Sequence, residues 1–515
     1  MPRVPRQRPT ACMPGCRQWR STLKRKGRRL LSAVSTLHVQ NEDAFSGQLR
    51  LKRQSSQTVD GDFSVALRIP FPPSVMADNT CRPGTPPPRS IRILGAGLVA
   101  VWGTQVVLAT HPAVPPLLLM GCVQAIAWVA FAWLVRLPGP LPGALAWAVG
   151  FRVIASLTQP LMEDDWARYL WDGWRFLSAG NPYHAAPAEF FDDASVPELL
   201  QRRLSEINNP HLPTVYGPLL QLGFAVAAWV APGELWPWKL ITLAADLGVL
   251  GLIHRIFGSR AAALYGWCPI VIHETCVNAH ADVLAILPLV AAAWAHQRQR
   301  PWATGIGLGF AISGKVLALP AVPFLLGIRN LRGWAALGVT LIAFHAPFWG
   351  SNGLGSSLQT FAAGWEFNSS LVGILGTWLP ADRAKLLALA MVAPFLALHF
   401  WKCLRNPAAT PRLDGVFGGV LIASAVVNPW YLLWMAPFVA AFPTLTGWTA
   451  MAAVLLSYAT ALNLGINAPG PYSHPVWLRP IEYGLVAAAA LFDGLRHFRA
   501  GRASVRTESS AKRPG

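Results

Sequence analysis

Long apolar stretches separated by short polar breaks dominate this sequence from about Ile91 to Leu495. An α-helix needs about 20 consecutive apolar residues to cross a bilayer, and fewer where the bilayer is thinned. By that criterion we count roughly 12 to 14 stretches that could span. Only 13% of the 515 residues are charged, against about 25% in an average soluble domain. The sequence therefore predicts an all-α, polytopic transmembrane helical bundle over residues 91–495, without a sizeable soluble domain.

The two ends of the chain differ from this bundle. Residues 1–90 contain 16 Lys and Arg but 5 Asp and Glu, with many Pro and Ser. They lack the continuous apolar core of a signal peptide. We expect either a disordered basic extension or a start codon assigned too far upstream, with translation in fact beginning at Met76. Residues 496–515 are predicted to form a basic cytoplasmic tail.

Basic residues after Ile91 recur in alternate loops, which predicts the orientation of the bundle. By the positive-inside rule these loops face the cytoplasm, and the polar clusters between them face outward. We expect an integral protein of a bacterial plasma (inner) membrane, with residues 214–231 forming a re-entrant or interfacial helix that does not cross. The residues behind this prediction are Arg136, His254, Arg255, Arg260, Arg298, Arg300, Arg329, Arg332, Lys402, Arg405, Arg412, Arg496, Arg499 and Arg502. Because the charge of +19 lies in these loops and in the first ninety residues, it does not indicate a nucleic-acid partner.

The longest predicted outer loop, residues 160–213, begins with three adjacent carboxylates, Glu163, Asp164 and Asp165. Aromatic residues and Leu then recur at helical spacing up to Phe176, as in an amphipathic helix lying at the membrane interface. Acidic residues can simply mark the water boundary of a span. Alternatively, one carboxylate could take the proton from an acceptor hydroxyl, as glycosyl transfer requires. A carboxylate at this boundary could meet both a lipid-linked donor and a polar acceptor.

The segment EDDWARYLWDGWRFLSAGNPY resembles the first outer loop of polyprenol-phosphate-mannose-dependent mannosyltransferases in the glycosyltransferase C superfamily. Five further segments resemble the family in the same order: NNPHLPTVYGPLLQL, VNAHADVLAILP, ISGKVLALPAVP, WEFNSSL and VVNPWYLLWMAPF. The resemblance covers residues 91–495 and departs from the family at Gly217, where Pro is common, and in the segment Ala279–Asp282. It implies inverting transfer of a hexose, mannose first, from a polyprenyl-phosphate donor to an extracytoplasmic glycan or lipid acceptor.

The resemblance also implies roles for the acidic residues. Asp164 and Asp165 match the family's acidic pair, one of which would be the general base, with Asp164 slightly ahead. Glu163 offers a third carboxylate. Ionisable groups near spans are costly and are therefore candidates for function. The full set of predicted substrate-binding residues is Glu163, Arg168, Arg175, Tyr216, His280, Asp282, Lys315, Trp365 and Asn368.

Each of these residues also has a structural interpretation. Lys315 could neutralise the donor phosphate or could be a snorkelling lysine at the end of a span. Arg168 and Arg175 could bind the donor phosphate or membrane lipid head groups. The corner around His280 and Asp282 could bind sugar and phosphate, form a polar network, or bind a metal, which is the least favoured option. Trp365 and Asn368 could contact a sugar or belong to the aromatic belt.

Other function classes find less support in the sequence. We find no P-loop, no G-x-G-x-x-G after a strand and no H-E-x-x-H, and the seven Cys lack metal-ligand spacing. We therefore predict no cofactor and no metal. The alternative function is a secondary transporter or lipid-linked sugar flippase. Transporters place ionisable residues at the midplane and often contain repeats, whereas here the polar clusters gather on one predicted face and no repeat is evident.

Overall fold

The computed structural model describes residues 89–511 except 351–354, 356–358, 361–363, 408 and 468–469, with side chains up to residue 499. The predicted extension 1–90, apart from its last two residues, and the Met76 start lie outside this part. Every regular element in the described part is a helix, apart from one isolated bridge between Phe367 and Val426. The all-α prediction is confirmed.

Four helices of the described part are long and apolar enough to cross a membrane. They are α2 (Arg89–Leu108), α3 (Pro116–Arg136), α8 (Trp236–Trp267) and α16 (Ala381–Arg405). On α16 most apolar side chains are exposed, among them Leu386, Leu389 and Met391. An apolar surface of this kind is suited to lipid rather than to water, so the chain is an all-α membrane protein.

The other helices are shorter than the apolar stretches suggested. Pro288 lies inside α10 (Asp282–Gln297), and Pro320 lies in the 3-10 helix η3 (Val316–Ala321), which leads into α12 (Val322–Leu326). Proline removes a backbone donor, and such breaks are tolerated at membrane depth where protein surrounds them. The remaining helices in this part of the bundle are α4 (Ala144–Ala155), α9 (Pro269–Ile272), α11 (Pro301–Gly314), α13 (Leu331–His345), α15 (Leu371–Leu375), α17 (Leu413–Ile422), α18 (Ala436–Ala441), α19 (Leu445–Ala453), α20 (Ala461–Leu464) and α21 (Leu478–Ala511), with the π-helix η2 (His273–Val277) and the 3-10 helices η4 (Ala346–Phe348), η5 (Pro429–Trp434) and η6 (Val454–Tyr458). Helix α21 continues through the predicted boundary at residue 495.

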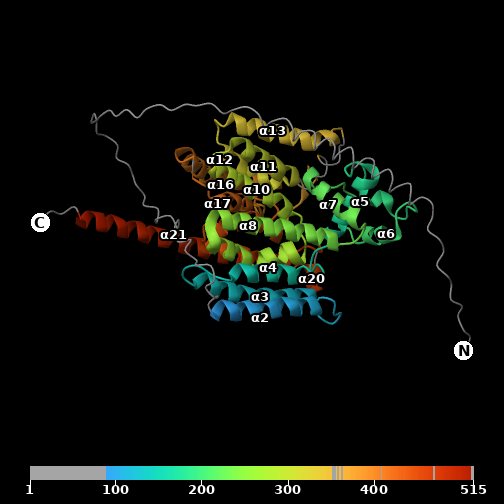
Figure 1. The fold of residues 1–515 in the computed structure, drawn as a ribbon, viewed down its shortest axis with the longest axis horizontal. Coiled ribbons are helices and arrows are strands. Elements are labelled where there is room, and N and C mark those ends of the chain that lie inside the picture. Colours follow the sequence, from blue (N-terminus) through green and yellow to red (C-terminus); the bar gives the residue numbers. More distant parts are fainter. Residues whose placement is uncertain are drawn as a thin grey trace, which may run out of the picture. The chain divides into compact units, whose positions relative to one another are not determined.

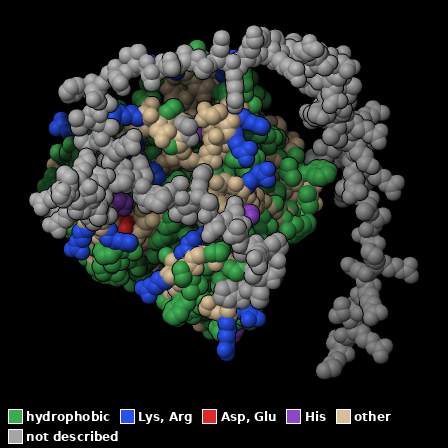
Figure 2. Space-filling model, turned by 60° about the vertical axis from the view of Figure 1, so that its left-hand side comes forward, with side chains coloured by type: hydrophobic (Ala, Val, Ile, Leu, Met, Phe, Trp, Pro, Cys, Tyr) green, Lys and Arg blue, Asp and Glu red, His purple; other side chains and the backbone are tan. Residues whose placement is uncertain are grey.

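One end of the bundle collects the basic loops. Helix α8 is interrupted at Gly258, whose φ of 87° allows the chain to turn back, and Tyr265 then lies against Asp246 of the preceding segment. At this turn the Arg260 guanidinium donates to the carbonyls of Val135, Leu137 and Gly139. Figure 2, which brings forward the left-hand side of Figure 1, shows many Lys and Arg side chains and few Asp or Glu. Two of the basic loops, the one after α3 and the turn within α8, therefore meet in space.

The opposite end carries the predicted outer loop 160–213. It folds into α5 (Asp165–Ala179), η1 (Pro187–Phe190) and α6 (Glu198–Leu204), which lie beside α7 (Pro218–Val230) in Figure 1. Helix α7 begins where the Gly217 amide donates to the Gly314 carbonyl, and the residues that follow it return to the same end. The structure has no membrane that would test whether α7 crosses, so the re-entrant assignment stays a prediction.

A buried ion pair joins the helices behind this end. Arg152 of α4 and Asp246 of α8 are 2.7 Å apart and fully buried. Tyr265 and Thr275 donate to the same carboxylate, and Arg152 also donates to the Gly266 carbonyl. Buried charges are stable only when paired and hydrogen-bonded in this way. The network fixes η2, which the functional site uses, against α4 and α8.

Candidate functional site

The three carboxylates lie at the start of α5, at the end of the bundle opposite the basic loops. Burial, followed by the charge of Asp165, raises the pKa of Asp164 to about 6. Burial and the neighbouring carboxylates also raise the pKa of Glu163 well above its ordinary value. Like charges this close cannot all ionise at little cost. The carboxyl groups of Glu163 and Asp164 therefore release their protons at higher pH than free carboxyl groups do.

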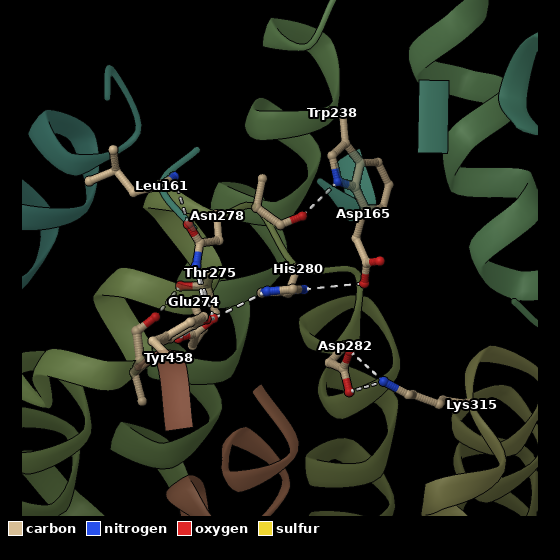
Figure 3. Close-up of polar contacts among 12 residues, drawn as sticks. Leu161, Asp165, Trp238, Glu274, Thr275, Asn278, His280, Asp282, Lys315 and Tyr458 are labelled. Atoms are coloured by element: carbon tan, nitrogen blue, oxygen red, sulfur yellow. Dashed lines mark hydrogen bonds and ion pairs between the residues drawn. The ribbon is translucent and has the colours of Figure 1, made fainter. Parts of the chain in front are cut away.

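Asp165 differs from its two neighbours in having partners from other elements. The Tyr216 hydroxyl donates to Asp165 Oδ2 over 3.1 Å, and His280 Nδ1 lies 3.9 Å from the same oxygen. Figure 3 shows the His280 ring between Asp165 and Glu274. A hydroxyl donor and an imidazole nitrogen thus lie against one oxygen of Asp165. Asp165 is therefore the carboxylate that the fold brings against Tyr216 and His280, and the choice of the base between Asp164 and Asp165 stays a prediction.

His280 is held in place on every side. Its Nε2 lies 3.2 Å from Glu274 Oε2, a close ion-pair contact that is not aligned as a hydrogen bond. Its ring stacks on the Trp430 indole, with centroids 4.1 Å apart and planes 18° from parallel. Ala279 before it has a φ of +58°, and the Trp238 indole donates to the Ala279 carbonyl. A non-glycine residue adopts this conformation at a cost, so packing and this hydrogen bond direct the imidazole toward Asp165.

Glu274 anchors a buried hydrogen-bond network in η2. The Tyr458 hydroxyl donates to Glu274 over 3.0 Å, and the Asn278 amide donates to it over 3.2 Å. The Asn278 side-chain oxygen accepts from the Leu161 amide, two residues before the carboxylate cluster. Lys239 of α8 donates to the carbonyls of Thr158 in the same loop and of Val277 in η2. These contacts fix the loop that carries the carboxylates to the helix that carries Glu274.

Lys315 and Asp282 form a second charged pair at this end. The Lys315 ammonium donates to both Asp282 oxygens, over 2.7 and 2.8 Å, and lies 4.6 Å above the Tyr431 ring. The Trp434 indole also donates to Asp282. The Lys315 side chain is 18% exposed and Asp282 is buried. A partly accessible ammonium fixed by a buried carboxylate is a suitable cation for an anionic group.

The two predicted arginines bind the protein itself. The Arg168 guanidinium is buried and donates to the carbonyls of Asn209 and Leu212, so it closes the loop after α6. Arg175 lies 4.2 Å above the Phe190 ring. This geometry favours a structural role for Arg168, whereas Arg175 stays at the surface of the loop.

Trp365 and Asn368 lie on the other side of the site and do not act together. Asn368 is buried and donates to Glu482 of α21 over 3.0 Å, which favours a structural role. Trp365 packs near Tyr472, with ring centroids 6.3 Å apart, and the Tyr472 hydroxyl accepts from Asn208. Trp365 also lines a mainly apolar cavity of about 370 Å³ between α16 and α17.

Several site residues escaped the sequence reasoning. Trp430, which stacks on His280, Lys239, which donates to the Val277 carbonyl, and Tyr458, which lies 184 residues from its partner Glu274, were not among the predicted residues. The charge of Lys239 inside an apolar stretch was the signal that could have indicated it. In the described part of the chain, no group of three or more His, Cys, Asp or Glu side chains is arranged to hold a metal ion.

The fold and the site define an all-α helical membrane protein with a polar, carboxylate-bearing site at one end of the bundle. The chain is similar to a polyprenol-phosphate-mannose-dependent alpha-(1-2)-phosphatidylinositol pentamannoside mannosyltransferase from Mycobacterium tuberculosis (strain CDC 1551 / Oshkosh), with 25% identity over 250 residues. The match covers 44% of this chain and 56% of the relative, so the chain spans about half of the relative's length. No family model and no solved structure matches the chain.

Proposed function

We propose that this protein is a membrane glycosyltransferase that moves a hexose, mannose in the first instance, from a polyprenyl-phosphate donor to a glycan or lipid acceptor. The observation that carries the proposal is Asp165, a carboxylate at the mouth of a helical bundle. Its side chain is 29% exposed, whereas Glu274 behind it is fully buried. A substrate can therefore reach Asp165 at the same end of the bundle as the Lys315 ammonium. The similarity to a polyprenol-phosphate-mannose-dependent enzyme agrees with this chemistry.

The reaction needs a proton acceptor on one side of the sugar and a cation on the other. Asp165 takes the proton of the acceptor hydroxyl as its oxygen forms a bond to the anomeric carbon. The bond between that carbon and the phosphate oxygen breaks, and polyprenyl phosphate leaves with the electron pair. Lys315 stabilises the charge that develops on the phosphate. Attack opposite the leaving group inverts the anomeric carbon.

The proposed site faces outward, because the basic loops at the other end are assigned to the cytoplasm. The membrane is proposed to be a bacterial inner membrane. The Arg152–Asp246 pair does not support the transporter alternative. Both side chains are fully buried, so in this structure they do not line a path for a substrate.

The test is transfer of radiolabelled mannose from polyprenyl-phosphate mannose to glycan and lipid acceptors by purified protein in lipid. We expect Asp165→Asn to lower the rate by about 100-fold or more, as loss of a general base does. Asp193→Asn is the matched control, because Asp193 lies in the same loop but interacts with Ser195 and Arg175 and not with the cluster. Wild-type rates in Asp164→Asn, Asp165→Asn and the double variant would reject the base assignment. A wild-type protein that transfers no sugar would reject the function.

A further inference from the structure

The carboxylate cluster raises a question that the function alone leaves open: which member carries the charge. Glu163, Asp164 and Asp165 are consecutive and share one environment, so a charge on one opposes a charge on the next. A general base has to be ionised when the acceptor binds. A cluster without an internal preference would distribute its charge over three positions. Asp165 is the member that accepts from Tyr216 and lies at ion-pair distance from His280, whereas His280 acts on Asp164 from beyond that distance.

Glu274 and His280 form a buried pair next to Asp165. Both are buried, at 0% and 1% side-chain exposure, and the imidazole has one nitrogen near each of two carboxylates. Glu274 receives two hydrogen bonds from neutral donors, Tyr458 and Asn278. A carboxylate buried so completely still needs a cation nearby, and an imidazolium at His280 meets that need while presenting its other nitrogen to Asp165.

We propose that His280, charged and fixed by Glu274, is the positioning residue that makes Asp165 the ionised member of the cluster. The inference rests on the proposed function, because it deepens the role of the same site. The 3.9 Å separation between His280 Nδ1 and Asp165 is an ion-pair distance and too long for a hydrogen bond. His280 therefore acts through its charge on Asp165 and does not touch the reacting atoms.

The stack with Trp430 strengthens this arrangement. An aromatic face attracts a cation, and the indole lies nearly parallel to the imidazole at 4.1 Å. The ring cannot turn away, because Trp430 covers one face and the Ala279 backbone is fixed by Trp238. The titratable groups around His280 are Asp164 and Asp165 on the α5 side, His273 and Glu274 in η2, and the Asp282–Lys315 pair that follows it.

The first test measures kinetics as a function of pH for the His280→Gln and Glu274→Gln variants and for the double variant. We expect kcat to fall by about 10- to 100-fold with KM changed by less than about threefold, because a charge on the base is lost and not a substrate contact. The acidic limb of the kcat profile should move to higher pH, since the proton is then shared among the carboxylates. The double variant should lose no more than the worse single variant, because the two residues act as one unit.

The matched control is His273→Gln. His273 is as buried as His280 and adjoins Glu274, but in the described part of the chain no ion-pair contact joins its ring to Asp165, as one does for His280. It should keep its pH profile, and the unfolding temperature of each variant shows whether it is folded. The inference is overturned if folded His280→Gln keeps the wild-type profile, if only KM changes, or if the losses of the two single variants add.

The second test does not depend on activity. An apolar carbodiimide adds to protonated carboxyl groups and leaves an N-acylurea that mass spectrometry can locate, whereas carboxylates do not react. In the wild type at pH 5, below the raised pKa of Asp164, we expect label on Glu163 and Asp164 but not on Asp165. In His280→Gln the label should also reach Asp165, at least threefold above the wild type. Equal labelling of Asp165 in both proteins would overturn the inference, even if sugar transfer is never observed.

Discussion

At the scale of single residues, ionisation of Asp164 destabilises the folded protein, and this effect can be measured. Its pKa in the folded protein is raised from 3.8 to about 6 by burial and by the charge of Asp165. Between these two values the unfolded chain releases the proton and the folded protein keeps it, so stability falls as pH rises. Above about pH 6 the accumulated loss is about 1–3 kcal/mol. We expect Asp164→Asn to raise the unfolding temperature at pH 8 and to leave it unchanged at pH 4.

The measurement is thermal unfolding in detergent at both pH values. Asp193→Asn is again the control, because hydrogen bonds from Ser195 lower the pKa of that exposed carboxyl, the opposite direction. It should not stabilise the protein at pH 8. A stabilisation by Asp164→Asn of the same size at pH 4 and pH 8 would mean that the substitution acts through packing and that the ionisation of Asp164 has no part in it.

How far single residues could be predicted depended on whether their signal was local. Asp165, His280 and Lys315 were identifiable because ionisable groups beside apolar sequence are costly unless they are used. Their pairing was not predictable, because Asp165 meets His280 across 115 positions and only the folded chain brings α5 to η2. Arg168 carried the same local signal as Lys315, yet it donates to backbone carbonyls. The sequence indicates that a charge is costly but not which group satisfies it.

At the scale of helices, the packing of α5 against α7 sets the position of the carboxylates. A methyl group on Gly173 of α5 would lie 2.2 Å from the Phe224 carbonyl oxygen of α7. This distance is far below contact, so Gly173→Ala must push the two helices apart. Overpacking of this kind costs about 1–3 kcal/mol. We expect Gly173→Ala to lower the unfolding temperature and to reduce sugar transfer by about tenfold or more, because small displacements of catalytic groups are costly.

The control for this substitution is Gly251→Ala in α8. No atom lies within 4 Å of a methyl group at Gly251, and Ala is favoured over Gly in a helix by about 1 kcal/mol. Gly251→Ala should therefore be neutral or stabilising and fully active. If Gly173→Ala behaves like Gly251→Ala in both assays, the close approach of α5 and α7 is not what positions the site.

Helix type was predictable from apolar length, whereas the breaks within the apolar stretches were not. The segment from Pro269 to Val277 has apolar residues on both sides of a polar centre, and nothing in this pattern marks a change of helix type. It is nevertheless an α-helical turn followed by the π-helix η2. A π-helix is stable only where tertiary contacts hold it. Here the contacts come from Asp246, which accepts from Thr275, and from Tyr458. These partners are distant in sequence, so no local pattern could reveal the break.

At the scale of the whole bundle, charge is divided between the two ends. Arg255 and Arg298, from different loops, both lie over the Trp294 ring at the basic end. The acidic cluster and Lys315 lie at the other end. The positive-inside rule predicted this division from short loops alone, because it reads composition and does not depend on how the helices pack. The rule predicts a topology, and the packing then decides which side chains meet.

The assignment of the two ends to compartments can be tested with single cysteines in a chain whose native cysteines are replaced. Ser195 is exposed in the loop before α6, and Asn406 is exposed in the basic loop after α16. In intact cells, a membrane-impermeant maleimide should label Ser195→Cys, and it should reach Asn406→Cys only after the membrane is permeabilised. The opposite pattern would place Asp165 on the cytoplasmic side, where nucleotide-activated sugars are available. A carboxylate facing those donors would not need a lipid-borne sugar, and the proposed donor class would have to be abandoned even if transfer of a sugar were observed.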